Sequence, residues 1–276
     1  MKASLSRGRR WLGWVKLGII IYCAIGIAFY YLQDYILFHP SPVERTLKYE
    51  LGSAYREYNI PYDRKTNINI VEFTGQPDDT AAKGVVLYFH GNRKNITWYA
   101  SYAPNFTTRG YEVWMMDYPG FGKSTGIFTE ERLYEYALQV YKLARKRFRP
   151  ADIIIYGKSM GTGIAAELAS VRDCRYLLLE TPYYSMTSLV SHYMPLYPVS
   201  NMLHYRFPIN EFLEKVTAPV VIFQGSDDGL IPLDNARKLA PLLKSRDEFV
   251  IIPAGGHNNL NEFALYHQKL DSLLAH

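Results

Sequence analysis

Residues 152–169 read DIIIYGKSMGTGIAAELA, and this stretch decides the fold. Three isoleucines and a tyrosine form a short apolar run, which is typical of a buried strand. From Ile164 onward, apolar residues repeat at helical spacing. Between these two segments, Gly157 and Gly161 lie two positions on either side of Ser159, and small residues there allow a sharp turn. The stretch therefore predicts a strand, a tight turn and a helix, with the Ser159 hydroxyl held at the carboxyl end of the strand.

The rest of the chain alternates strands and helices from about residue 46 onward. Near-continuous apolar runs are expected in a parallel sheet that helices cover on both faces. We therefore predict one mostly parallel α/β domain over residues 46–276, in the range of a single-sheet domain. The predicted strands are 55–60, 68–73, 85–89, 111–116, 152–156, 176–179, 220–224 and 249–252, and the predicted helices are 96–108, 130–147, 160–171, 233–243 and 260–274.

Two loops downstream of Ser159 carry the groups that could activate its hydroxyl. The loop after the seventh predicted strand contains Asp227 and Asp228, and the loop after the eighth contains His257. In a sheet of this type, functional groups gather beyond the carboxyl ends of the strands. A serine, a carboxylate and a histidine in this order match a triad in which the imidazole takes the serine proton and the carboxylate orients the imidazole. We predict Ser159, Asp228 and His257 as catalytic residues, with Asp227 as a turn residue.

The loop after the third predicted strand contains His90-Gly91-Asn92. In triad enzymes of this order, a backbone N–H from this loop and the N–H after the nucleophile stabilise the negative oxygen of the reaction intermediate. We assign this oxyanion hole to Asn92 and Met160. For His90 itself, a structural role in shaping the loop is favoured over a catalytic one.

The N-terminal segment predicts a membrane anchor. Residues 1–10 carry four basic residues and no acidic one, and residues 11–32 are apolar apart from Lys16. A helix over 11–32 would be about 33 Å long, which is enough to cross a hydrocarbon core. We predict a basic region at 1–10, a transmembrane signal-anchor helix at 11–32 and a linker at 33–45. The alternative, a cleaved signal peptide, is disfavoured because its apolar region usually spans only about 7 to 15 residues.

The charge distribution predicts the orientation of this anchor. The net charge is +5, and all of this excess lies in the first 16 residues, since the remainder has as many acidic as basic residues. Basic flanks stay on the cytoplasmic side, so we predict a cytoplasmic N-terminus and a catalytic domain in an extracytoplasmic compartment. A neutral domain also argues against a nucleic-acid partner, which would require a basic face.

A segment at 181–217, between the sixth and seventh predicted strands, is predicted as a cap over Ser159. It has no clean periodicity and is rich in aromatic and methionine side chains. Such side chains suit an acyl chain, and we predict Tyr183, Tyr184 and Met186, together with Trp98 on the first helix, as substrate-binding residues. Ordinary packing against the sheet is an equally weighted alternative.

Taken together, these motifs resemble the α/β-hydrolase superfamily, and in particular its single-pass, N-terminally anchored, serine-aminopeptidase-like hydrolases, which include the protein depalmitoylases. One departure is Gln224, where the family usually has histidine; this position is not a triad member. The resemblance rests on LFHP at 37–40, FHGN at 89–92, DYPGFGKSTG at 117–126, GKSMG at 157–161, residues 225–232 and GHN at 256–258.

The sequence thus predicts a membrane-anchored serine hydrolase that acts through an acyl-enzyme on an ester or thioester with an apolar acyl group. No cofactor is expected, and no metal, because no His, Cys and carboxylate cluster has ligand spacing. Resemblance also allows an amidase or aminopeptidase, and a non-catalytic binding scaffold is a further alternative. A dinucleotide site built on Gly161, Gly163, Ala166 and Glu180 is weaker, because it leaves the aspartate and histidine loops unexplained. In the hydrolase interpretation, Glu180 is a solvated or capping residue.

Overall fold

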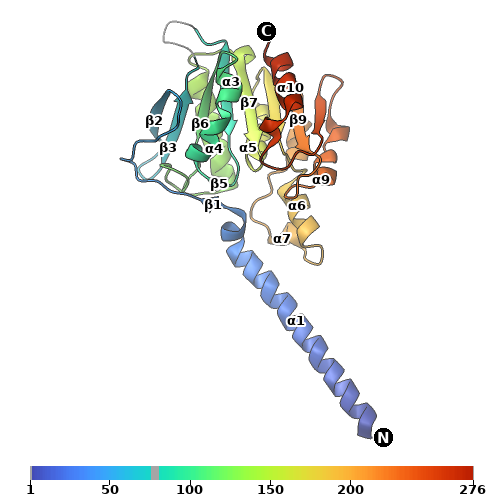
Figure 1. The fold of residues 1–276 in the computed structure, drawn as a ribbon. Helices are drawn as coiled ribbons and strands as arrows, with labels where there is room; N and C mark the ends of the chain where they lie inside the picture. The colour runs from blue at the N-terminus through green and yellow to red at the C-terminus, as the bar shows by residue number, and fades with distance from the viewer. Residues whose placement is uncertain (1, 76–80, 276) are drawn as a thin grey trace.

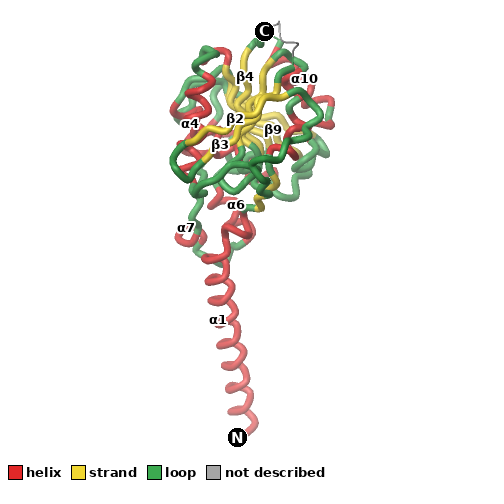
Figure 2. Tube along the Cα trace, turned by 90° about the vertical axis from the view of Figure 1, so that its left-hand side faces the viewer, coloured by secondary structure: helices red, strands yellow, loops and turns green. Residues whose placement is uncertain are grey.

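The computed structural model describes residues 2–75 and 81–275, with side chains from Arg10 onward. Most of the predicted basic region at 1–10 therefore lies outside the described side chains. An eight-stranded sheet has the order β10-β9-β8-β7-β4-β6-β3-β2, and it forms the centre of the body in Figures 1 and 2. The strands are β2 (Tyr55–Pro61), β3 (Asn67–Phe73), β4 (Gly84–Phe89), β6 (Tyr111–Met116), β7 (Ile153–Lys158), β8 (Tyr176–Glu180), β9 (Val220–Gly225) and β10 (Glu248–Ile252).

The sheet is parallel except at one edge. Strand β2 pairs antiparallel with β3, and β3 pairs antiparallel with β6, whereas all the other neighbours are parallel. The predicted α/β class with a mostly parallel sheet is confirmed. A separate two-stranded parallel ladder joins β1 (His39–Pro40) to β5 (Arg93–Lys94).

Both faces of the central strands are buried, and the alternation of side chains along a strand divides them between two core clusters. On β4, Val85 and Leu87 belong to one core cluster, while Val86 and Tyr88 belong to another. Helices cover both faces (Figure 2). These helices are α2 (Ile96–Tyr99), α3 (Pro104–Thr107), α4 (Glu130–Ala144), α5 (Gly161–Val171), α9 (Leu233–Arg237) and α10 (Ala264–Leu274).

Two predicted helices are interrupted in the structure. The predicted helix 96–108 is split into α2, a 3₁₀ turn and α3, which begins at Pro104. The predicted helix 233–243 stops at Arg237, and a 3₁₀ turn containing Pro241 follows. In both places proline lacks the N–H that an α-helical hydrogen bond needs, so it ends the helix before it or begins a new one.

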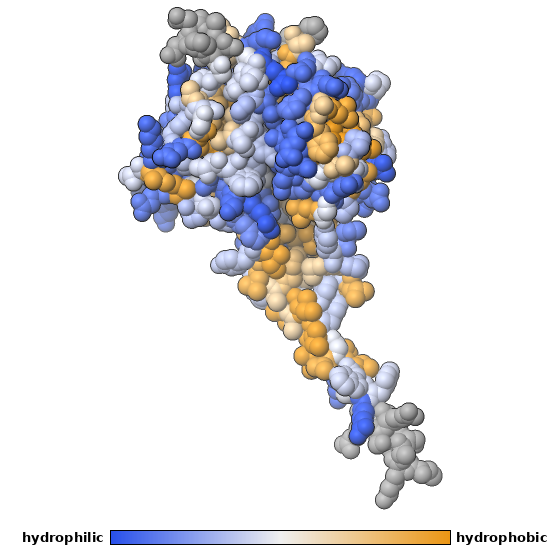
Figure 3. Space-filling view, viewed as in Figure 1, coloured by the Kyte–Doolittle hydropathy of each residue, from blue (hydrophilic) through white to orange (hydrophobic). Residues whose placement is uncertain are grey.

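Helix α1 (Lys2–Leu37) extends away from the body (Figure 1). Its 28 residues Arg10–Leu37 are long and apolar enough to cross a membrane. The helix contains the predicted anchor 11–32 and continues through the first five residues of the predicted linker, because the first proline in this region is Pro40. Apolar side chains gather along α1 and at the base of the body, where α1 meets it (Figure 3).

Between β8 and β9 the chain forms three short helices, α6 (Met186–Tyr193), α7 (Val199–Met202) and α8 (Ile209–Leu213). Helix α8 packs on α5. Helices α6 and α7 lie at the end of the body that faces α1 (Figures 1 and 2). We call the segment 181–217 the cap.

Candidate active site

The turn around Ser159 is strained in the way its sequence predicts. Ser159 follows β7 directly and has a φ of +52°, a left-handed conformation that rarely suits a residue other than glycine. A Cβ at Gly161 would lie 2.0 Å from the Phe89 carbonyl oxygen, and one at Gly157 would lie 2.5 Å from the Gly161 carbonyl oxygen. Both positions therefore exclude any side chain. Strain of this kind costs about 1–3 kcal/mol and persists only where the surrounding structure enforces it.

Three side chains from different loops meet at this turn. The Nε2 atom of His257 lies 3.0 Å from Ser159 Oγ, and its Nδ1 atom lies 2.8 Å from Asp228 Oδ2. A carboxylate beside Nδ1 holds the proton there, which leaves Nε2 free to accept the serine proton. The structure thus brings together the three residues that the sequence predicts as a triad, at the carboxyl edge of the sheet.

The Asp228 side chain is buried, and both of its carboxylate oxygens have hydrogen-bond partners. Its Oδ1 accepts hydrogen bonds from the N–H groups of Leu230 at 2.9 Å and Ile231 at 2.8 Å. Burial raises the pKa of the Asp228 carboxyl, but the hydrogen bond and charge of His257, together with these two N–H groups, outweigh burial and hold the pKa below its usual value. The neighbouring Asp227 is exposed and accepts a hydrogen bond from the Ser226 hydroxyl at 2.6 Å.

Gln224 contributes to the same site. Its Nε2 donates to Asp228 Oδ2 at 3.2 Å and to the Ile231 carbonyl at 3.0 Å. In the sequence this position stands out only as a departure from the family. It is the last residue of the predicted strand 220–224, and nothing local indicates its contact with the carboxylate.

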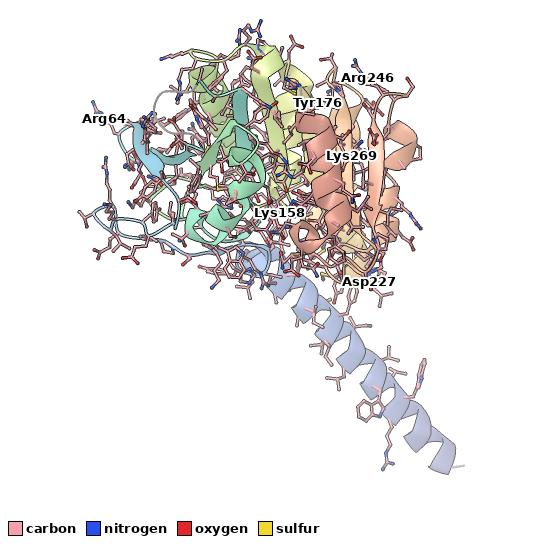
Figure 4. The ribbon with its side chains drawn as sticks, turned by 45° about the horizontal axis from the view of Figure 1, so that its top comes forward. Arg64, Lys158, Tyr176, Asp227, Arg246 and Lys269 are labelled. Atoms are coloured by element: carbon pink, nitrogen blue, oxygen red, sulfur yellow. The ribbon has the colours of Figure 1, made fainter. Side chains whose placement is uncertain are left out.

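A buried ion pair lies behind His257. Lys158 Nζ contacts Glu180 Oε1 and donates to the His257 carbonyl oxygen at 3.1 Å. Glu180 also accepts from the hydroxyls of Tyr156 and Tyr266, and burial raises the pKa of both phenols well above the ordinary value, so both remain donors. The interpretation of Glu180 as a solvated or capping residue is wrong, because its side chain is completely buried. Figure 4 shows Lys158 inside the body and Asp227 at its edge.

The two residues predicted to form the oxyanion hole lie beside Ser159. Asn92 and Met160 line the same cavity as Ser159. Within residues 2–75 and 81–275, neither backbone N–H has a hydrogen-bond acceptor, so both are available to a ligand. The loop is held by the start of the body, because the Asn92 carboxamide donates to the Leu37 carbonyl and the His39 N–H donates to the Asn92 carbonyl at 2.9 Å.

His90 lies outside the cavity lining and is completely buried. Its Nδ1 lies 2.7 Å from the Gly91 carbonyl oxygen, its Nε2 lies 3.3 Å from Asp117 Oδ1, and its ring stacks on Tyr99. These contacts fit a residue that shapes the loop.

The cavity that contains Ser159 has a volume of about 560 Å³. Of the residues predicted to bind substrate, Tyr183 and Met186 line this cavity. Tyr184 and Trp98 do not: Tyr184 packs against the core, and Trp98 is 55% exposed on α2. Helix α1 also contributes to the lining, which the sequence does not predict. The remaining lining residues are Ile25, Ala28, Phe29, Leu32, Ile36 and Leu37 from α1, Leu189, Val190, Tyr193 and Met194 from the cap, and Arg93, Leu230 and Ile231.

The described residues contain no group of three or more His, Cys, Asp and Glu side chains that could hold a metal ion.

Comparison with known sequences finds relatives at modest identity. Residues 80–210 match the family model for serine aminopeptidases of the S33 type, a range that includes Ser159 but ends before Asp228 and His257. The alpha/beta hydrolase domain-containing protein 17C of Xenopus tropicalis is 28% identical over 196 residues, which cover 69% of this chain and 61% of that protein. The human protein of the same name is 26% identical over 201 residues, covering 71% of this chain and 59% of its own. The match thus spans about three fifths of these relatives.

Solved structures with the same fold are more distant in sequence. The esterase Pf2001 of Pyrococcus furiosus has a TM-score of 0.67 at 14% identity, covering 87% of this chain and 97% of its own. An alpha-beta hydrolase from Vibrio vulnificus has a TM-score of 0.65 at 20% identity, covering 80% of each chain. With the strand order, these similarities show that the chain has the α/β-hydrolase fold.

Proposed function

We propose that this protein is a membrane-anchored serine hydrolase that cleaves carboxylic esters or thioesters of apolar acyl groups. The observation that carries the proposal is the hydrogen-bonded series Ser159–His257–Asp228 at one end of an apolar cavity. The esterase and hydrolase names of the relatives support the same reaction class.

The reaction follows from the roles of these groups. Ser159 Oγ attacks the acyl carbonyl carbon while His257 Nε2 takes the hydroxyl proton, and the N–H groups of Asn92 and Met160 stabilise the resulting oxyanion. The bond from carbon to the leaving oxygen or sulfur breaks, and the leaving group takes the proton from His257. Water then attacks the acyl-enzyme, gives a proton to His257 and releases the carboxylic acid, and the proton returns to Ser159.

The cavity lining favours an apolar acyl group over a peptide with a free amino terminus. An aminopeptidase needs an acidic group to hold the substrate ammonium, but neither Asp nor Glu is present among the described lining residues. A binding scaffold is also less well supported, because the strained serine and its two partners have no role in binding alone. The apolar length and basic flank of α1 support an anchor with a cytoplasmic N-terminus and the catalytic domain across the membrane.

Active-site labelling of the full chain tests this proposal. We expect a fluorophosphonate probe to label the wild type but not Ser159→Ala, and p-nitrophenyl butyrate turnover to fall about 10⁴-fold or more in Ser159→Ala and about 10⁴-fold in Asp228→Asn. Asp227→Asn is the matched control and should retain turnover. Equal turnover by wild type and Ser159→Ala, or no labelling of folded wild type, would overturn the proposal.

A further inference from the structure

Helix α1 is fixed to the cap by aromatic and polar contacts. The ring of Tyr22 stacks on that of Tyr197, with centroids 4.5 Å apart. The Tyr22 hydroxyl donates to the Leu196 carbonyl at 2.8 Å, and the Tyr197 hydroxyl donates to the Tyr22 carbonyl at 3.0 Å. The loop between α6 and α7 therefore lies against α1 more than ten residues before the helix ends.

A second contact fixes α1 nearer to the body. Gln33 is completely buried, its Nε2 donates to the Met202 carbonyl at 3.0 Å, and its Oε1 accepts from the His204 N–H at 2.7 Å. A buried amide satisfied on both its oxygen and its nitrogen specifies one relative position, since any shift would leave polar groups unpaired.

The cavity lies between the two elements joined by these contacts. Its α1 wall is formed by one helical face that includes Ile25, Phe29, Leu32 and Ile36. From Ile25 to Leu37 the helix rises about 18 Å. Ser159, only 7% exposed, lies at the inner end, whereas Ile25 and Tyr193 at the outer part are about half exposed. The cavity is thus an apolar passage from the surface of α1 to the nucleophile.

The length of α1 allows an estimate of how deep the outer part of this passage lies in the membrane. Arg10–Leu37 spans about 42 Å, whereas a hydrocarbon core is about 30 Å thick. If Arg10 lies at the far surface, an upright helix reaches the near boundary of the hydrocarbon at about Tyr30, where an aromatic belt is expected. Tyr22, and with it the cap loop, then lies about 12 Å below that boundary. The outer part of the passage opens among the acyl chains of the near leaflet.

We propose that a long acyl chain enters this cavity directly from the bilayer, between α1 and α6, and that α1 is a wall of the acyl site as well as an anchor. This inference rests on the proposed function, and it names the substrate class as esters or thioesters whose single acyl chain is inserted in the leaflet. The exposed apolar side chains at the cap tip, Tyr193 at 53% and Leu196 at 79%, would then contact lipid.

Chain-length selectivity of the full protein in phosphatidylcholine vesicles tests the route. Ala28→Trp fills the α1 wall, so we expect the ratio of kcat/KM for p-nitrophenyl palmitate to that for p-nitrophenyl butyrate to fall about tenfold or more. Ile20→Trp is the control, because Ile20 is exposed on the same helix and lines none of the described cavities. It should keep the wild-type ratio.

The outcomes separate this inference from the proposed function. If wild type cleaves neither ester, the proposed function fails. If wild type cleaves both but Ala28→Trp keeps the wild-type ratio, the hydrolase stands and the route through the bilayer is overturned. A palmitoyl lysophospholipid and an S-palmitoyl peptide, presented in the same vesicles, show which acyl carrier the enzyme accepts. The route is supported if Ala28→Trp lowers the cleavage of either palmitoyl substrate more than it lowers the cleavage of p-nitrophenyl butyrate.

A depth measurement gives evidence independent of turnover. An NBD fluorophore on Leu196→Cys, in a chain with Cys23→Ser and Cys174→Ser, should emit at shorter wavelength in vesicles and be quenched by lipids that carry a spin label on the acyl chain. The same fluorophore on Arg246→Cys, which lies at the end of the body away from α1 in Figure 4, should emit as in water. Water-like emission from position 196 would overturn the proposal.

Discussion

Lys158 links the strand that precedes Ser159 to the loop that carries His257. It lies directly before the nucleophile, its ammonium is buried, and it contacts both Glu180 and the backbone carbonyl of His257. A buried ion pair is weak evidence for stability, because desolvation offsets the attraction of the two charges. The hydrogen bond to His257 gives Lys158 a second role, which is to position the loop that carries the imidazole.

Stability and turnover should separate when this pair is changed. Lys158→Met leaves Glu180 charged and unpaired, so we expect the free energy of unfolding to fall by about 3–5 kcal/mol and kcat to fall about 10-fold or more as the His257 loop loses its donor. The double variant Lys158→Met with Glu180→Gln should regain most of the stability but not kcat. Chemical denaturation and p-nitrophenyl butyrate kinetics measure the two effects. Recovery of both would assign Lys158 a structural role alone.

The local motifs predict the three side chains that meet at the candidate site, but the contacts that support them could not be predicted. Ser159, Asp228 and His257 each follow a strand in a readable pattern, so one rule about strand ends predicts their meeting. Gln224 and Lys158 lie in strands that look merely buried, and their partners come from other segments of the chain. Their roles depend on tertiary contacts that no local pattern records.

Among the helices and strands, too, some features follow from local sequence patterns and others do not. The strands and the parallel class follow from apolar runs, whereas the short helices around Pro104 and Pro241 depend on how proline divides a helical pattern. Helix α1 was predicted as a spanning segment by length and composition alone. Its face toward the cap was not predicted, because a uniformly apolar helix gives no sign of which side packs against protein.

Gln33 is the polar link between α1 and the cap, and its replacement should loosen that contact. Gln33→Leu keeps the approximate volume but leaves the Met202 carbonyl and the His204 N–H without partners, at about 1–3 kcal/mol each. We expect faster hydrogen exchange of the His204 amide and a lower Tm, by several degrees. Gln268→Leu, on the exposed surface of α10, is the matched control. Unchanged exchange at His204 would contradict a fixed contact between α1 and the cap.

At the scale of the whole molecule, α1, the cap and the loop at residues 90–95 meet at one end of the sheet. Residues just after α1 are hydrogen-bonded to this loop: the Ser41 N–H donates to the Lys94 carbonyl at 3.1 Å, and the Asn95 carboxamide donates to the Ser41 carbonyl at 2.8 Å. The chain from Leu37 to Ser41 thus connects α1 to the loop that would bind the oxyanion.

This arrangement predicts that α1 stays attached in the mature protein. Gly26 and Ala28 loosely resemble the small residues of a signal-peptide cleavage site. Cleavage after Ala28 would remove Tyr22 and Ile25, expose the cap loop to water and take away part of the cavity wall. After expression in cells, we expect the intact protein to keep its N-terminal peptides by mass spectrometry and to remain in the membrane pellet after an alkaline carbonate wash. A soluble, active form that begins near Phe29 would contradict this prediction. It would mean that an apolar segment able to cross a membrane served only for export, and that the contacts of Tyr22 with the cap do not exist in the mature enzyme.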